Sequence, residues 1–160
     1  MGHCRRFEAN RPVGGVRRTV RGTVLRYEAD TDASPPTAWA LIACPSRWPE
    51  WSPHVRGGWH LGWPQVEEGS LGALRLFGAV PVPAKITRVD PGHAWEWRVG
   101  LVTMDHVVDP REDGGSRVTI TISAPPPFEA TLRRTYGPFI QRLVDRLART
   151  ADEAVASHGG

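Results

Sequence analysis

The chain has 160 residues, the size of one ordinary domain, and 40% of its residues are hydrophobic while 23% are charged. No stretch reaches the ~18 uninterrupted apolar residues that a membrane-spanning helix requires, so a transmembrane protein is excluded. The two cysteines, Cys4 and Cys44, are too few for a disulfide framework or a CxxC metal site, and the N-terminus has no apolar signal segment. We therefore expect a reducing, cytoplasmic location.

Charge is unevenly distributed along the chain, whose formal net charge is +3. Residues 1–22 contain six arginines and one acidic residue, whereas residues 23–160 contain 14 basic and 16 acidic groups. We expect 1–22 to be a basic, flexible tail, either a solvated leader or an electrostatic arm for nucleic acid or anionic lipid. Residues 23–157 are expected to form a single domain. This domain has no overall basic field, so nucleic acid is not an expected partner.

The start of the domain predicts one strand followed by two short helices. Residues 23–31 alternate apolar and polar side chains, as a half-buried strand does. Ser34 can cap a helix whose first turn takes the next two residues, both proline, and Pro45 ends that helix. Residues 46–51 then form at most one further helical turn.

Glycine and proline residues divide the middle of the chain into short segments typical of an antiparallel meander. Alternation is clearest around Trp95 and Trp97, around Met104 and His106, and in the segment that contains Ile120. Six such segments, together with the first strand, make a sheet of seven strands. We expect the six further strands near residues 54–60, 70–77, 80–89, 93–99, 102–109 and 116–123.

The C-terminal segment changes to helical spacing. Apolar residues recur at intervals of three and four from Phe139 to residue 154, which predicts an amphipathic helix that ends near residue 156. Pro138 suits its first turn, and an earlier helical turn over 132–136, kinked at Gly137-Pro138, is the alternative. This helix is the one large element left to cover the apolar face of the sheet. We therefore predict an α+β fold in which a seven-stranded, curved antiparallel sheet wraps around a long C-terminal helix.

Five features of this chain occur in an order and spacing that are specific for one fold. They are Gly69 before a strand and the segments ASPPTAWALI at 33–42, WPEWSPHV at 48–55, VDPGHAWEW at 89–97 and DHVVDPREDGGSRVTIT at 105–121. With these features the chain resembles the polyketide cyclase/dehydrase and lipid-transport family of the START and Bet v 1-like (SRPBCC) superfamily. The resemblance implies the helix-grip fold over residues 23 to about 156.

The resemblance also implies a deep pocket between the curved sheet and the C-terminal helix. Members of this family bind apolar or polycyclic molecules, and only some of them are enzymes. We predict that this chain binds a lipid or polyketide-like molecule as a monomer or homodimer. The alternative is a polyketide cyclase or dehydratase, so enzymatic activity is left open at this point.

Seven tryptophans and one central histidine are the main site candidates. An indole ring supplies a large apolar surface and one N–H donor, which suits both a ligand pocket and a packed core. His106 on the inner face can act as a general acid or base, bind a ligand carbonyl or be an ordinary core histidine. No phosphate-binding loop, dinucleotide motif or metal-ligand spacing is present, so we expect neither cofactor nor metal. The predicted ligand-binding residues are Tyr27, Trp95, Trp97, Met104, His106, Ile120, Phe139 and Leu143.

Overall fold

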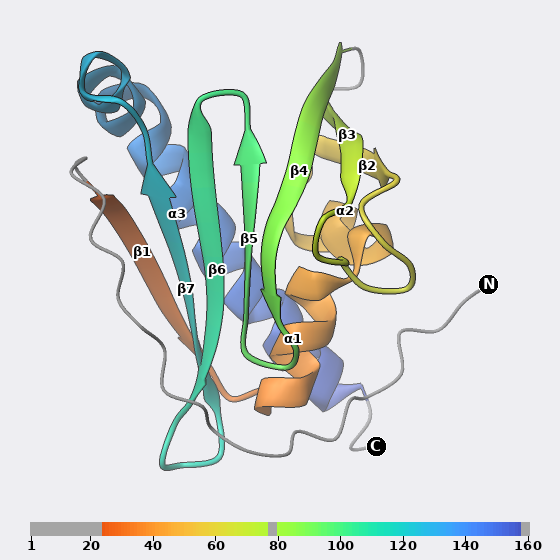
Figure 1. Ribbon diagram of the computed structural model, residues 1–160. Coiled ribbons are helices and arrows are strands. Elements are labelled where there is room, and N and C mark those ends of the chain that lie inside the picture. Colours follow the sequence, from red (N-terminus) through yellow and green to blue (C-terminus); the bar gives the residue numbers. More distant parts are fainter. Residues whose placement is uncertain (1–23, 77–79, 158–160) are drawn as a thin grey trace.

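The computed structural model describes residues 24–76 and 80–157 of the chain (Figure 1). The predicted basic tail, residues 1–22, lies outside this part. Seven strands form one sheet, two short helices follow the first strand, and a long helix ends the chain. The predicted fold class is therefore confirmed. The elements are β1 (Val24–Thr31), α1 (Pro35–Ala43), the 3-10 turn η1 (Pro45–Arg47), α2 (Trp48–Trp51), β2 (Val55–Trp59), β3 (Leu71–Leu76), β4 (Val80–Asp90), β5 (Ala94–Val99), β6 (Val102–Pro110), β7 (Ser116–Ser123) and α3 (Pro126–Ala156).

The sheet is antiparallel throughout and has the order β1-β7-β6-β5-β4-β3-β2. Its register places Tyr27 opposite Ile120, Ile120 opposite His106, and His106 opposite Trp95. These four residues therefore form one row across β1, β7, β6 and β5. Since directly paired residues point to the same side of a sheet, the row faces one way, toward the core. Trp97 lies two residues beyond Trp95 and faces the same side.

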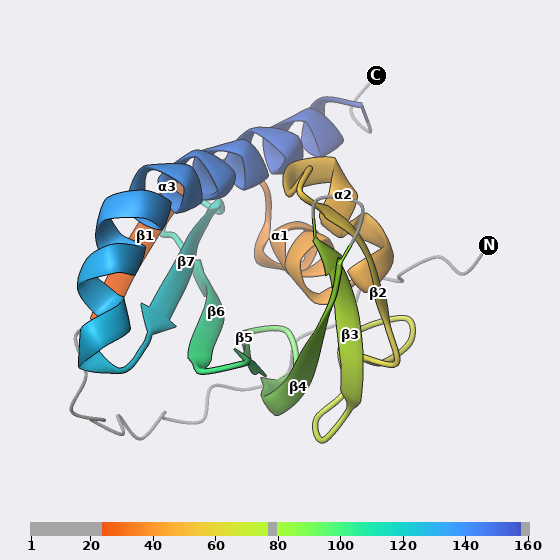
Figure 2. The ribbon, with the colours of Figure 1, turned by 90° about the horizontal axis from the view of Figure 1, so that it is seen from above.

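Helix α3 covers the concave side of this curved sheet. Figure 2 shows α3 running across the open side of the arc of strands, with α1 and α2 beside it. Its buried side chains recur at helical spacing and pack against the inner face of the sheet. They are Ile140, Leu143, Val144, Leu147, Ala148 and Ala151. No helix within the described residues is long and apolar enough to cross a membrane.

The start of α3 corrects the sequence-based expectation. We predicted Pro138 in the first turn, or a separate earlier turn over 132–136, but one helix begins at Pro126 and continues through Pro138. Pro126 and the proline after it occupy the first helical positions, where a missing N–H costs nothing. Pro138 inside the helix cannot donate the usual hydrogen bond to the preceding turn, and Figure 2 shows that α3 bends along its length.

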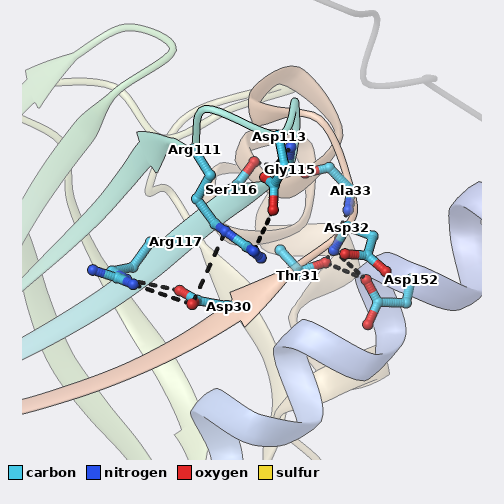
Figure 3. A network of polar contacts seen from close by, with 10 residues as sticks. All are labelled: Asp30, Thr31, Asp32, Ala33, Arg111, Asp113, Gly115, Ser116, Arg117 and Asp152. Carbon is cyan, nitrogen blue, oxygen red and sulfur yellow. Dashed lines mark hydrogen bonds and ion pairs between the residues drawn. The ribbon is translucent and has the colours of Figure 1, made fainter.

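A polar network joins the C-terminal half of α3 to the end of β1 (Figure 3). The Asp152 carboxylate of α3 accepts hydrogen bonds from the Thr31 hydroxyl at 2.5 Å and from the Asp32 backbone N–H at 2.8 Å. The buried Ser116 hydroxyl of β7 donates to the Ala33 carbonyl at 2.6 Å. The two bonds of Asp152 fix the C-terminal half of α3 on the junction between β1 and α1, and the Ser116 bond joins this junction to β7.

Candidate ligand-binding site

An apolar cavity lies between the sheet and α3. Its walls come from α2, the turn that follows and the start of β2, from the inner faces of β5, β6 and β7, and from α3. The cavity volume is about 50 Å³, which is room for a few water molecules but well below the roughly 300–1,000 Å³ of typical ligand pockets. The lining residues are Trp48, Trp51, Ser52, His54, Val55, Trp95, Trp97, Met104, His106, Ile120, Ile140 and Leu143.

One side of the cavity is an aromatic cluster of four rings, Trp48, Trp95, Trp97 and His106. The His106 imidazole lies parallel to the Trp95 indole, with ring centroids 4.0 Å apart. Trp48 is stacked on Trp95 at 5.7 Å, and Trp97 presents an edge-on arrangement to both indoles at 5.1–5.3 Å. Such offset and edge-on pairs stabilise the cluster beyond the burial of its apolar area. The cluster therefore packs α2, through Trp48, against β5.

Three buried tryptophans have structural hydrogen bonds. The indole N–H of Trp48 donates to the Ile42 carbonyl at 2.8 Å, and that of Trp51 donates to the Leu41 carbonyl at 3.1 Å. Both bonds attach α2 to α1. The indole N–H of Trp39 donates to the side chain of Gln65 at 3.1 Å. These three rings thus hold α1 and α2 together and attach α1 to the segment that contains Gln65.

The other two buried tryptophans differ from these. The Nε1 atoms of Trp95 and Trp97 and the Nδ1 atom of His106 are buried and have no hydrogen-bond partner in the described part of the chain. Buried polar atoms in native proteins are nearly always hydrogen-bonded, so three unpaired atoms in adjacent side chains require an explanation. All three belong to residues that line the cavity.

The titratable groups that line the cavity are neutral near pH 7. Burial lowers the pKa of His106 to about 3, and the nearby Trp95 backbone acts in the opposite direction. Burial also lowers the pKa of His54, whose Nδ1 lies 3.1 Å from the Ser52 hydroxyl. Among the described residues, no group of three or more histidine, cysteine, aspartate and glutamate side chains is placed to hold a metal ion.

Six of the eight predicted ligand-binding residues line this cavity: Trp95, Trp97, Met104, His106, Ile120 and Leu143. Tyr27 and Phe139 do not. Tyr27 is half-buried on β1, and its hydroxyl lies close to Gly137 of α3. A Cβ atom added to Gly137 would be 3.1 Å from the hydroxyl oxygen. Phe139 packs against the His54 ring, with centroids 4.9 Å apart, and so lies behind the cavity wall.

Six lining residues were not among the predicted set. Five of them lie in the segment WPEWSPHV, which the sequence singled out for its resemblance but without a direction for any side chain: Trp48, Trp51, Ser52, His54 and Val55. Ile140 precedes Leu143 by three residues on the same helical face, and this spacing was a usable signal.

An antiparallel sheet curved around a C-terminal helix, with an apolar cavity between them, defines a helix-grip protein. The model of the family described as "Polyketide cyclase / dehydrase and lipid transport" matches residues 23–152. The chain belongs to this family, and the resemblance identified from the sequence is confirmed. No curated protein matches the chain by sequence.

Solved structures with the same fold come from several bacteria. A START superfamily protein from Mycobacterium smegmatis is 12% identical, with a TM-score of 0.62, and the match covers 82% of this chain and 98% of that one. A hypothetical protein from Helicobacter pylori is 13% identical, with a TM-score of 0.66 and coverage of 89% and 99%. A protein from Nitrosomonas europaea is 13% identical, with a TM-score of 0.66 and coverage of 83% and 96%. At these identities the likeness establishes the fold alone.

Proposed function

We propose that this protein binds a hydrophobic or polycyclic small molecule, lipid-like or polyketide-like, between the sheet and α3. The observation that carries the proposal is the apolar cavity at this place, lined by aromatic and aliphatic side chains and a few neutral polar groups. Ligand sites in proteins typically have this composition. Membership of a family described by polyketide chemistry and lipid transport supports the same class of ligand.

The cavity must widen to take such a ligand, because about 50 Å³ is too small for a polycyclic molecule. The lining residues that keep most contact with solvent are the half-buried His54 and Met104, whereas Trp51, Trp97 and Leu143 are only 6%, 7% and 7% exposed. The strand residues behind them are more deeply buried, with Trp95 at 1% and His106 at 2%. A ligand therefore has to displace lining side chains, and those beside His54 and Met104 are nearest to solvent.

The alternative function is a polyketide cyclase or dehydratase that uses His106 as general acid or base. A histidine with a pKa of about 3 is unprotonated near pH 7 and is a weak base, whereas efficient proton transfer favours a pKa near the working pH. No carboxylate lines the cavity in the described residues, so His106 has no acidic partner there. Binding without catalysis is the function that this geometry favours.

Calorimetric titration with fluorene, a planar hydrocarbon, tests the proposal. We expect saturable binding with one site per chain. Leu143→Trp should abolish it by filling the cavity, whereas Val155→Trp, which adds the same ring at a position with 45% exposure, should retain it. Circular dichroism must first show that both variants are folded. Equal binding by the two variants, or no saturable binding to the wild type, would contradict the proposal.

Two accompanying expectations come from the sequence and remain predictions. They are that the protein works in the cytoplasm and that it is a monomer or homodimer. Native mass spectrometry of the protein purified from its own host measures the oligomeric state. The same spectrum reveals any small molecule that copurifies.

A further inference from the structure

We infer, on the basis of the ligand binding proposed above, that the ligand is a neutral planar carbonyl compound. Its oxygen accepts hydrogen bonds from the indole N–H groups of Trp95 and Trp97. The inference starts from the two unpaired donors in the aromatic cluster and from the lack of charged side chains among the described residues that line the cavity.

The unpaired indoles indicate a hydrogen-bond acceptor. An indole N–H can only donate, so a partner for Trp95 or Trp97 must carry an acceptor atom. A buried donor without a partner destabilises the folded protein, and an acceptor atom on the ligand removes this cost. The other buried tryptophans show that this fold otherwise satisfies its indoles within the chain: Trp39, Trp48 and Trp51 all donate to protein oxygens. The two exceptions lie two residues apart on one face of β5, in the wall of the cavity.

The shape of the cavity wall indicates a flat molecule. His106 and Trp95 are parallel to within 2°, and Trp97 is nearly perpendicular to both rings, at 81° and 82°. A planar ligand that lies beside the Trp97 ring can likewise meet this stack edge-on, an arrangement that aromatic rings prefer. A carbonyl oxygen on the edge of the ligand would then lie close to the indole nitrogens of Trp95 and Trp97.

Electrostatics distinguish a neutral carbonyl from a carboxylate. No lysine, arginine, aspartate or glutamate is among the cavity-lining residues in the described part of the chain. His54 and His106 are the titratable groups that face the cavity, and burial lowers the pKa of each. A carboxylate would therefore be buried without a counter-ion, which costs far more free energy than burial of a hydrogen-bonded ketone. The third unpaired atom, Nδ1 of His106, belongs to a neutral imidazole and can donate to the ligand or accept from it, according to the tautomer.

Three related compounds test the inference: fluorene, 9-fluorenone and fluorene-2-carboxylate, titrated calorimetrically against the intact chain. We expect 9-fluorenone to bind about tenfold more tightly than fluorene, which corresponds to one recovered hydrogen bond, and the carboxylate to bind most weakly. Equal binding of fluorene and 9-fluorenone would overturn the claim that the ligand carries a hydrogen-bond acceptor. Tightest binding of the carboxylate would overturn the claim that the ligand is neutral. In both cases the proposed function would stand. If none of the three compounds bound, the proposed function itself would fail.

Two variants separate the hydrogen bond from the loss of ring area. Trp97→Phe removes the unpaired N–H and should reduce the preference for 9-fluorenone over fluorene at least threefold. Trp51→Phe also shortens a cavity-lining ring, but its N–H is already bonded to the Leu41 carbonyl. The Trp51→Phe variant should bind both compounds more weakly by the same factor, so that the ratio of their affinities is unchanged. A similar loss of preference in the two variants would contradict a specific role of Trp97.

A measurement on the wild-type chain keeps the inference testable if a variant does not fold. The indole N–H protons give separate signals in a ¹H–¹⁵N spectrum, and hydrogen bonding to a carbonyl moves such a proton to lower field. Saturation with 9-fluorenone should move two indole signals to lower field, and fluorene should not. The signal that disappears in a folded Trp95→Phe or Trp97→Phe variant is assigned to the replaced tryptophan. Binding of 9-fluorenone without any low-field shift would overturn the inference.

Discussion

Replacement of His106 by Phe should make the protein less sensitive to acid. Burial holds the pKa of the folded imidazole at about 3, compared with an ordinary value of 6.5 that applies to the unfolded chain. Between these pH values the unfolded chain binds one more proton than the folded protein. Stability therefore falls as the pH falls, by about 1.4 kcal/mol per pH unit. From pH 7 to pH 5 this histidine alone accounts for a loss of about 2 kcal/mol in the free energy of unfolding.

Urea denaturation at pH 7 and pH 5, followed by circular dichroism, measures this loss. Phe has no titratable group and can keep the ring stacked on Trp95, so His106→Phe should lose about 2 kcal/mol less than the wild type between the two pH values. Burial lowers the pKa of His54 as well, but His54 is present in both proteins and cancels in the comparison. His60 is exposed, and His60→Asn is the matched control, with the full wild-type loss expected. An equal loss in wild type and His106→Phe would show that His106 is not buried in its neutral form.

Two further substitutions test the contacts of α3. Leu143→Ala should lower the free energy of unfolding by about 2–5 kcal/mol, because it enlarges the cavity under the helix. The control Arg142→Ala, at an exposed position of the same helix, should change this free energy by less than about 0.5 kcal/mol. Similar values for the two variants would show that α3 does not cover the sheet here. Asp152→Ala should cost about 1–3 kcal/mol in urea denaturation, because Thr31 and Asp32 lose their acceptor, whereas Asp152→Asn keeps an acceptor oxygen and should cost less. Equal losses for these two variants would argue against the hydrogen bonds.

The sheet and the direction of its side chains were predictable because a strand has a period of two. Once Trp97 was placed on the inner face, Trp95 had to share that face, and the antiparallel register brought His106 and Ile120 beside it. Tyr27 was also placed on this face correctly. Whether it reaches the cavity depends on how closely α3 approaches, and the pattern of β1 contains no information about that distance.

The other wall of the cavity and the start of α3 were beyond the local patterns. Ser52 and His54 lie in an irregular turn, where no periodicity fixes the direction of a side chain. Pro138 is as typical of a helix start as of a bend, and the prolines that begin α3 were not recognised as its first turn. The unpaired atoms of Trp95 and Trp97 depend on which oxygens the folded chain brings near them. A single sequence does not show those positions.

The pairing of the first strand with the last sets the order in which the chain can fold. Strands β2 to β7 each pair with a neighbour in sequence through short connections, whereas β1 pairs with β7 about 90 residues away. Closing so long a loop costs more entropy than forming a hairpin, so β1 is expected to join the sheet late. During synthesis on the ribosome, the hairpins of the meander can form as they emerge. Their tryptophan-bearing face stays open to water, and to other nascent chains, until the final helix has been made.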